Sequence, residues 1–80
     1  MPRFFFHIRH EGQLVRDPEG TELADLAAAR AEALADAREL LADQIKGGRV
    51  TYEGQIEIWD ELERVLATVL LQDAFGPVKQ

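Results

Sequence analysis

Hydrophobic and polar residues alternate in two separate parts of the chain, as they do in β-strands. The first part is Arg3 to Arg9, where one face holds Phe4, Phe6 and Ile8 and the other holds Phe5, His7 and Arg9. Glu11-Gly12 then predicts a tight turn, because glycine tolerates the positive φ of hairpin turns. A second strand is predicted over residues 14–17, followed by a β-turn over 17–20 that contains Pro18 and Gly20. The chain therefore opens with a predicted β-hairpin.

A helical pattern follows the hairpin and runs to Lys46. Asp25 is placed to cap its first turn, and Gly47-Gly48 is placed to end it with a left-handed residue. At 100° per residue, one broad face is apolar and consists of Leu26, Ala33, Leu34, Ala37, Leu40, Leu41 and Ile45. The opposite side carries Glu32, Asp36, Glu39, Asp43 and Lys46. The pattern predicts one helix that lies closely on a sheet through its alanines.

Alternation returns at Gln55 to Trp59 and continues beyond a polar turn. If Asp60 pairs with Arg64, Ile58 faces Leu66, and Ile56 faces Thr68 on the helix side. The predicted fold is α+β with the order β-β-α-β-β: one antiparallel sheet with a single long helix packed on one face. A single domain is expected over residues 1–75, and Gly76-Pro77 predicts a flexible tail over 76–80.

In this register the sheet is apolar on both faces, whereas one helix covers one face. The second face would expose an apolar surface suited to a partner, most simply a second copy related by a two-fold axis. The interface candidates are Phe5, His7, Arg9, Trp59, Val65, Val69 and Leu71. Two alternatives remain open: loops or the tail cover this face, or the register is shifted by one residue.

Composition narrows the function classes. The 80 residues carry a formal net charge of −6, which disfavours non-specific binding to nucleic acid or anionic membrane. The absence of cysteine fits a cytoplasmic protein, and no apolar run reaches transmembrane length. Serine and asparagine are also absent, so the usual nucleophiles are lacking and a non-enzymatic protein is expected. His7 and His10 point to opposite strand faces, so neither a metal site nor a cofactor is predicted.

Arg30 is a buried-charge candidate because it falls within the apolar helix stripe. Asp17 or Glu22, just before the helix, could pair with it. A further hypothesis is a small enzyme or anion-binding protein that uses Arg30 together with His7 and Arg9.

The opening Met1-Pro2-Arg3-Phe4-Phe5-Phe6-His7-Ile8-Arg9 resembles a family of small bacterial domains of unknown function. The likeness continues through residues 17–23 and 25–33. It departs at Leu62-Glu63, where the family has Asp-Gly, which puts the turn geometry in question. The resemblance implies a shared fold and no assigned activity. A looser likeness to HicB-type antitoxins, which also place a helix after a hairpin, suggests an alternative: a regulatory module that masks a protein partner.

Overall fold

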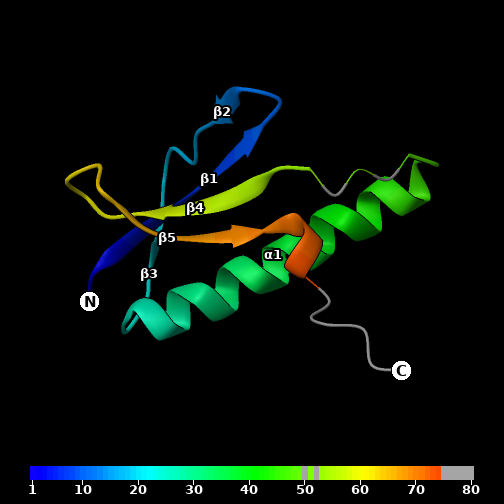
Figure 1. The fold of residues 1–80 in the computed structure, drawn as a ribbon. Coiled ribbons are helices and arrows are strands. Elements are labelled where there is room, and N and C mark those ends of the chain that lie inside the picture. The colour runs from blue at the N-terminus through cyan, green and yellow to red at the C-terminus, as the bar shows by residue number, and fades with distance from the viewer. Residues whose placement is uncertain (50, 52, 75–80) are drawn as a thin grey trace.

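The computed structural model describes residues 1–49, 51 and 53–74. One antiparallel sheet lies against one long helix, as Figure 1 shows. The elements are β1 (Arg3–His10), β2 (Gln13–Val15), β3 (Thr21–Glu22), α1 (Leu26–Lys46), β4 (Gln55–Trp59), β5 (Val65–Leu70) and the short 3-10 helix η1 (Leu71–Asp73). The strand order is β2-β1-β4-β5, and β3 pairs with β1. The predicted α+β fold is confirmed, with β3 as an additional short strand, and the predicted tail over 76–80 lies outside the described residues.

The first hairpin turns through two residues. Glu11 has φ 51° and Gly12 has φ 78°, and the flanking His10 and Gln13 pair across the strands. Positive φ at both central residues is the type I′ geometry, whose twist matches that of the two strands. The predicted turn is therefore confirmed.

After β2 the chain leaves the edge of β1 and returns to it as β3, and Asp17 holds the intervening segment. Its Oδ2 accepts a hydrogen bond from the Phe6 amide at 3.2 Å, in the gap between β2 and β3. Its Oδ1 accepts from the Glu19 and Gly20 amides, both at 3.2 Å, which closes the turn predicted here. Gly20 has φ +73°, and a Cβ there would lie 2.9 Å from the Phe5 ring. Both its backbone conformation and its close approach to β1 therefore require glycine.

Both predicted helix ends are confirmed. The Asp25 carboxylate accepts from the Ala28 amide at 2.8 Å. At the other end the Gly48 amide donates to the Ile45 carbonyl and the Arg49 amide to the Gln44 carbonyl, each at 3.1 Å. These two bonds form a Schellman motif, and Gly48, with φ +80°, is its left-handed residue.

The helix packs on the sheet through one row of residues spaced four apart. These fully buried residues are Ala29, Ala33, Ala37 and Leu41. The prediction that Arg30 is a buried charge is wrong, because its side chain is exposed. Residues spaced four apart form a row that is inclined to the helix axis. Near the start of the helix this row touches the sheet at Ala29, so Arg30, the next residue, lies on the side of the helix and not against the sheet. Neither proposed partner is available, since Glu22 pairs with Arg3 and Asp17 holds β1.

A β-bulge changes the register of the second hairpin. The Asp60 amide donates to the Arg64 carbonyl at 3.0 Å, as expected, and Trp59 pairs with Val65. Beyond that pair the register shifts, so that Ile58 faces Ala67 and not Leu66. The shift turns β5 over: Val69 and Leu71 face the helix side, contrary to prediction. Strict pairing would have pointed the Thr68 hydroxyl into the core, which is unfavourable without a hydrogen-bond partner.

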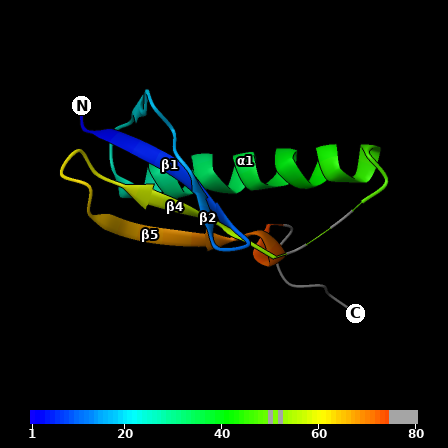
Figure 2. The same cartoon turned by 90° about the horizontal axis from the view of Figure 1, so that it is seen from above.

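The helix covers only part of its sheet face. It packs against β4, β5 and η1, whereas the β1–β2 hairpin rises away from it in Figure 1. Figure 2 shows the same helix from above, extending well past the end of β5. A helix is about 10 Å wide and strands lie about 4.8 Å apart, so one helix covers about two strands. Consequently Phe6 and Ile8 are only half-buried, and Val15 is 57% exposed. The expectation that one helix covers a whole four-stranded face is wrong.

Candidate functional site

The sheet face turned away from α1, here called the open face, brings together five of the seven predicted interface residues. Phe5 pairs with Trp59, His7 with Glu57, and Arg9 with Gln55. Cross-strand partners share a face, so all six side chains project to this side. Phe5, His7, Arg9 and Trp59 therefore share one face, as predicted. Val65 adjoins Trp59 at the outer strand and is 54% exposed.

Three other predicted residues lie elsewhere. Leu71 is 2% exposed and belongs to the core, and Val69 packs against the same core. Arg30 lies on the helix layer, on the opposite side of the sheet from His7 and Arg9. The structure therefore does not bring Arg30, His7 and Arg9 together, which overturns the hypothesis of an enzyme or anion site built from these three.

Glu57 is the centre of the open face and is only 5% exposed. Arg9 donates to it from Nε at 2.6 Å, Gln55 from Nε2 at 2.8 Å, and Trp59 from Nε1 at 3.0 Å. The hydrogen bond from Arg9 lowers the pKa of Glu57 to about 2, against burial, which acts to raise it. Glu57 is therefore ionised at neutral pH, and it fixes both the Arg9 guanidinium and the indole.

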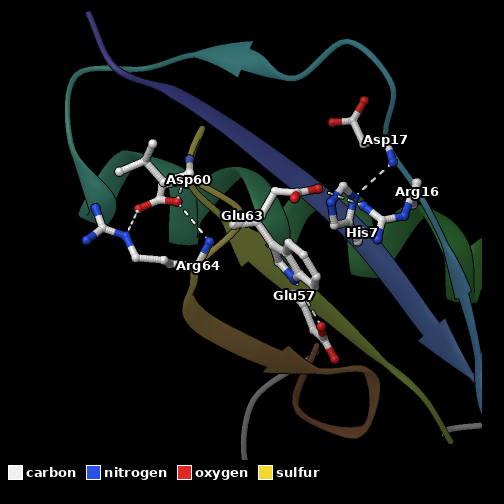
Figure 3. A network of polar contacts seen from close by, with 9 residues as sticks. His7, Arg16, Asp17, Glu57, Asp60, Glu63 and Arg64 are labelled. Carbon is white, nitrogen blue, oxygen red and sulfur yellow. Dashed lines mark hydrogen bonds and ion pairs between the residues drawn. The ribbon is translucent and has the colours of Figure 1, made fainter.

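His7 is buried beside this network and accepts a hydrogen bond at Nδ1 from the Asp17 amide at 2.9 Å (Figure 3). Its ring meets Trp59 edge-on, with 4.7 Å between ring centroids. Burial lowers the pKa of His7, and the positive charge of Arg16 lowers it further. The imidazole is thus held neutral, because only the neutral ring can accept at Nδ1. Burial acts to raise the pKa of Asp17, but hydrogen bonds from the Gly20, Phe6 and Glu19 amides outweigh it and lower that pKa.

Two segments cover part of the open face and enclose a cleft of about 510 Å³. Phe5, His7 and Trp59 form its floor, and its walls are residues 16–18 and 60–63. The Arg16 guanidinium lies 5.4 Å from the centroid of the Trp59 ring. A carboxylate oxygen of Glu63, on the opposite wall, lies 3.5 Å from a nitrogen of the same guanidinium. The indole is therefore partly packed within its own chain by a cation–π contact. This agrees in part with the alternative that loops cover the face.

The free edge beside this face is apolar. In the described part of the chain β5 is the outermost strand of the sheet. Its sequence is VLATVL, with neither a charge nor a proline. Val65, Leu66 and Leu70 are 54%, 39% and 37% exposed. The bulge contributes to this exposure, because it leaves Leu66 as the extra residue opposite Trp59.

Comparison with known families identifies the fold unit. The sequence model of the family described as Domain of unknown function (DUF6894) matches residues 3–72. The chain belongs to this family. The match includes all five strands and α1, and it confirms the predicted membership of a family without an assigned function. Comparisons with curated proteins and with solved structures give no match.

Two further findings describe this DUF6894 domain. Among its described residues, no helix combines the length and apolar character needed to cross a bilayer. Within the same residues, no three His, Cys, Asp or Glu side chains gather closely enough to hold a metal ion.

Sequence reasoning missed the roles of Glu57, Arg16 and Asp36. Alternation does place Glu57 on the same strand face as Trp59. Glu57 meets Arg9, however, only because β4 lies beside β1, and the sequence does not reveal that strand order. The contact of Arg16 with Trp59 likewise depends on the path of the segment after β2. The sequence places Asp36 on the side of the helix opposite its apolar face, yet Asp36 is half-buried, and burial raises its pKa, with Glu32 and Glu39 adding to the effect.

Proposed function

We propose that this DUF6894 domain is a non-enzymatic interaction domain that forms a homodimer through the edge of β5. The observation that carries the proposal is an outer strand with three large, exposed apolar side chains: Val65, Leu66 and Leu70. Proteins normally protect such an edge with charges, proline or a covering segment, because its unpaired backbone groups otherwise recruit another strand. VLATVL has neither a charge nor a proline.

A second copy is the simplest partner for this edge. Two β5 strands can pair antiparallel about a two-fold axis, so that each supplies the same surface to the other. Backbone hydrogen bonds would then join the two sheets, and the exposed valine and leucine side chains would pack across the axis. This contact leaves the Arg9–Glu57 network intact within each copy.

The edge is a better candidate than the centre of the open face. The central groups already have partners within the chain, since Glu57 accepts from three side chains and Arg16 lies over Trp59. A six-residue edge is small beside the ~800 Å² per partner of stable interfaces, so the expected affinity is about micromolar. Because each copy carries a net charge of −6, added salt should strengthen the dimer by screening repulsion.

The side-chain inventory supports a non-enzymatic role. The sequence contains no serine, cysteine or asparagine. His7 uses its Nδ1 to hold the Asp17 amide, which ties the ring to the fold. The lack of cysteine also fits our proposal of a cytoplasmic setting, and the net charge of −6 fits protein partners more than nucleic acid or membrane. A regulatory module that masks a protein partner is the alternative function.

Sedimentation velocity across micromolar concentrations tests the dimer. The wild-type chain should move from monomer to dimer as concentration rises. Leu70→Lys should remain monomeric, because a lysine at the pairing edge carries a desolvation cost and repels its copy across the axis. Leu66→Lys gives a second variant at the same edge.

Val15→Lys is the matched control, since Val15 is an exposed strand valine at the opposite end of the sheet and the change adds the same charge. It should dimerise like the wild type. A wild-type monomer at every concentration, or a dimer lost in Val15→Lys and retained in both leucine variants, contradicts the proposal. Far-ultraviolet circular dichroism confirms that each variant is folded.

A further inference from the structure

We propose that the groove between α1 and the β1–β2 hairpin binds a basic amphipathic helix of another protein. This surface lies on the helix side of the sheet, and the inference does not depend on the dimer. The groove has a volume of about 220 Å³. Its lining residues are Phe6, Ile8, Ile56 and Leu40, with the acids Asp36, Glu39 and Asp43.

The floor of the groove is sheet surface that α1 leaves uncovered. Phe6 and Ile8 are half-buried, although they project to the same side as the buried Ile56 and Ile58. Val15 pairs with Ile8, so it extends the same surface to the sheet edge, where it is 57% exposed. Two-layer domains usually bury such a face with a second helix beside the first. Within the described residues this chain supplies one helix, which lies over β4 and β5.

The charge on the groove selects the chemistry of the occupant. Asp36, Glu39 and Asp43 lie at i, i+3 and i+7 of α1, and they therefore follow the groove for about 10 Å. No ion pair among the described residues involves any of the three. Burial raises the pKa of Asp36, and the negative charges of Glu32 and Glu39 raise it further. A cation bound beside Asp36 would lower this pKa again.

A helix with apolar residues at i, i+3 or i+4, and i+7 fits this surface. Its apolar stripe would pack on Phe6, Ile8 and Val15, and its Lys or Arg residues would meet the three acids. The α1 helix of a second copy does not fit, because it is not basic: its acids Glu32, Asp36, Glu39 and Asp43 outnumber its basic residues Arg30, Arg38 and Lys46. Arg38, the arginine of α1 nearest to these acids in sequence, lies on the side of the helix away from the groove. There its Nε donates a hydrogen bond to the Ala74 carbonyl at 2.7 Å. The occupant is therefore a helix of different sequence and opposite charge.

Synthetic peptides test the inference with the full chain. The probe is a fluorescein-labelled Leu/Lys peptide of about 18 residues with its leucines at helical spacing, long enough to form a helix. A scrambled peptide of the same composition removes the apolar stripe and keeps the charge. Fluorescence anisotropy at about 0.15 M salt should show micromolar binding of the amphipathic peptide and at least about tenfold weaker binding of the scrambled one.

Variants of the acids test the location. Asp36→Asn/Asp43→Asn should weaken binding by about fivefold or more, since each lost ion pair contributes about two- to fivefold. The matched control is Glu19→Gln/Glu61→Gln, which removes the same charge from exposed residues away from the groove and should change binding by less than about twofold. Leu70→Lys, which tests the dimer separately, should bind the peptide like the wild type.

NMR shift perturbation should centre on Phe6, Ile8, Val15 and Leu40. Three binding results would overturn the inference: no binding at about 0.1 mM, equal binding of the scrambled peptide, or equal loss in the control variant. The last two outcomes would show a diffuse response to the net charge of −6. Perturbations centred on Trp59 or on β5 would also overturn it.

Discussion

At the scale of a single residue, Glu57 fixes the positions of the polar side chains on the open face. It is a nearly buried carboxylate that accepts hydrogen bonds from three side chains, and Arg9 supplies its only ion pair among the described residues. Glu57→Gln keeps the shape but removes the charge that matches the guanidinium, and it turns one acceptor into a donor. We expect urea unfolding to show a loss of about 1–3 kcal/mol at pH 7. Glu61→Gln, at an exposed turn residue, should change stability by less than about 0.5 kcal/mol.

The same carboxylate predicts a pH dependence. Its pKa is about 2 in the folded protein and 4.5 ordinarily, so the unfolded chain takes up the proton first as pH falls. Its contribution to stability is fully present above about pH 4.5 and is lost progressively toward pH 2, in total about 3 kcal/mol. Unfolding free energies measured across this range should therefore converge for the wild type and Glu57→Gln. A constant difference between the two proteins down to pH 2 would contradict the ionised network.

Glu63 occupies a backbone conformation that suits glycine. Its φ is +61°, in the left-handed region, and among the described residues the one ion pair of its side chain is the long contact to Arg16 at 3.5 Å. Glu63→Gly should raise the free energy of unfolding by about 0.5–1 kcal/mol, because the left-handed conformation costs about 1–2 kcal/mol for a residue with a Cβ, offset in part by glycine's greater freedom when unfolded. Glu61→Gly, two residues earlier and without a positive φ, should lower it by a similar amount.

At the scale of elements, the alanine row of α1 sets the distance between helix and sheet. Ala33 is fully buried at the middle of that row. Ala33→Leu should lower the free energy of unfolding by about 1–3 kcal/mol, because the added carbons must displace the helix or strain neighbouring rotamers. Ala31→Leu makes the same change on the exposed side and should stay within about 0.5 kcal/mol of wild type. Thermal unfolding of the two variants gives the comparison, and equal losses would show that the row is not tightly packed.

The sequence predicted elements better than their contacts. Asp25, Gly48 and the Glu11-Gly12 turn act through neighbouring backbone atoms, so local pattern was sufficient to place them. The bulge in β5 was missed because Val65-Leu66 reads as ordinary strand, and one extra residue reverses every side chain after it. The exposure of Arg30 was missed for a related reason, since a helical projection gives the apolar face but not the inclined row that touches the sheet.

At the scale of the whole molecule, the described residues form one long helix and a wide sheet, and they leave two surfaces without a covering layer. The β5 edge is apolar and uncharged, which suits a second copy. The groove beside α1 has an apolar floor and an acidic rim, which suits a basic helix. The strand order produces both surfaces, because it places β5 at the edge of the sheet and places β1 and β2 beyond the strands that α1 covers. That order could not be derived from a sequence in which both hairpins are locally complete.

The pairing of β5 with a second β5 is the central claim, and an isotope-filtered NOE experiment tests it most directly. A mixture of labelled and unlabelled chains at high concentration reports only contacts between copies. Pairing of two β5 strands should give intermolecular NOEs between backbone protons of β5, together with contacts from Leu66 and Leu70 side chains. Intermolecular NOEs confined to Trp59 and Phe5, or none while the protein sediments as a monomer, would contradict it.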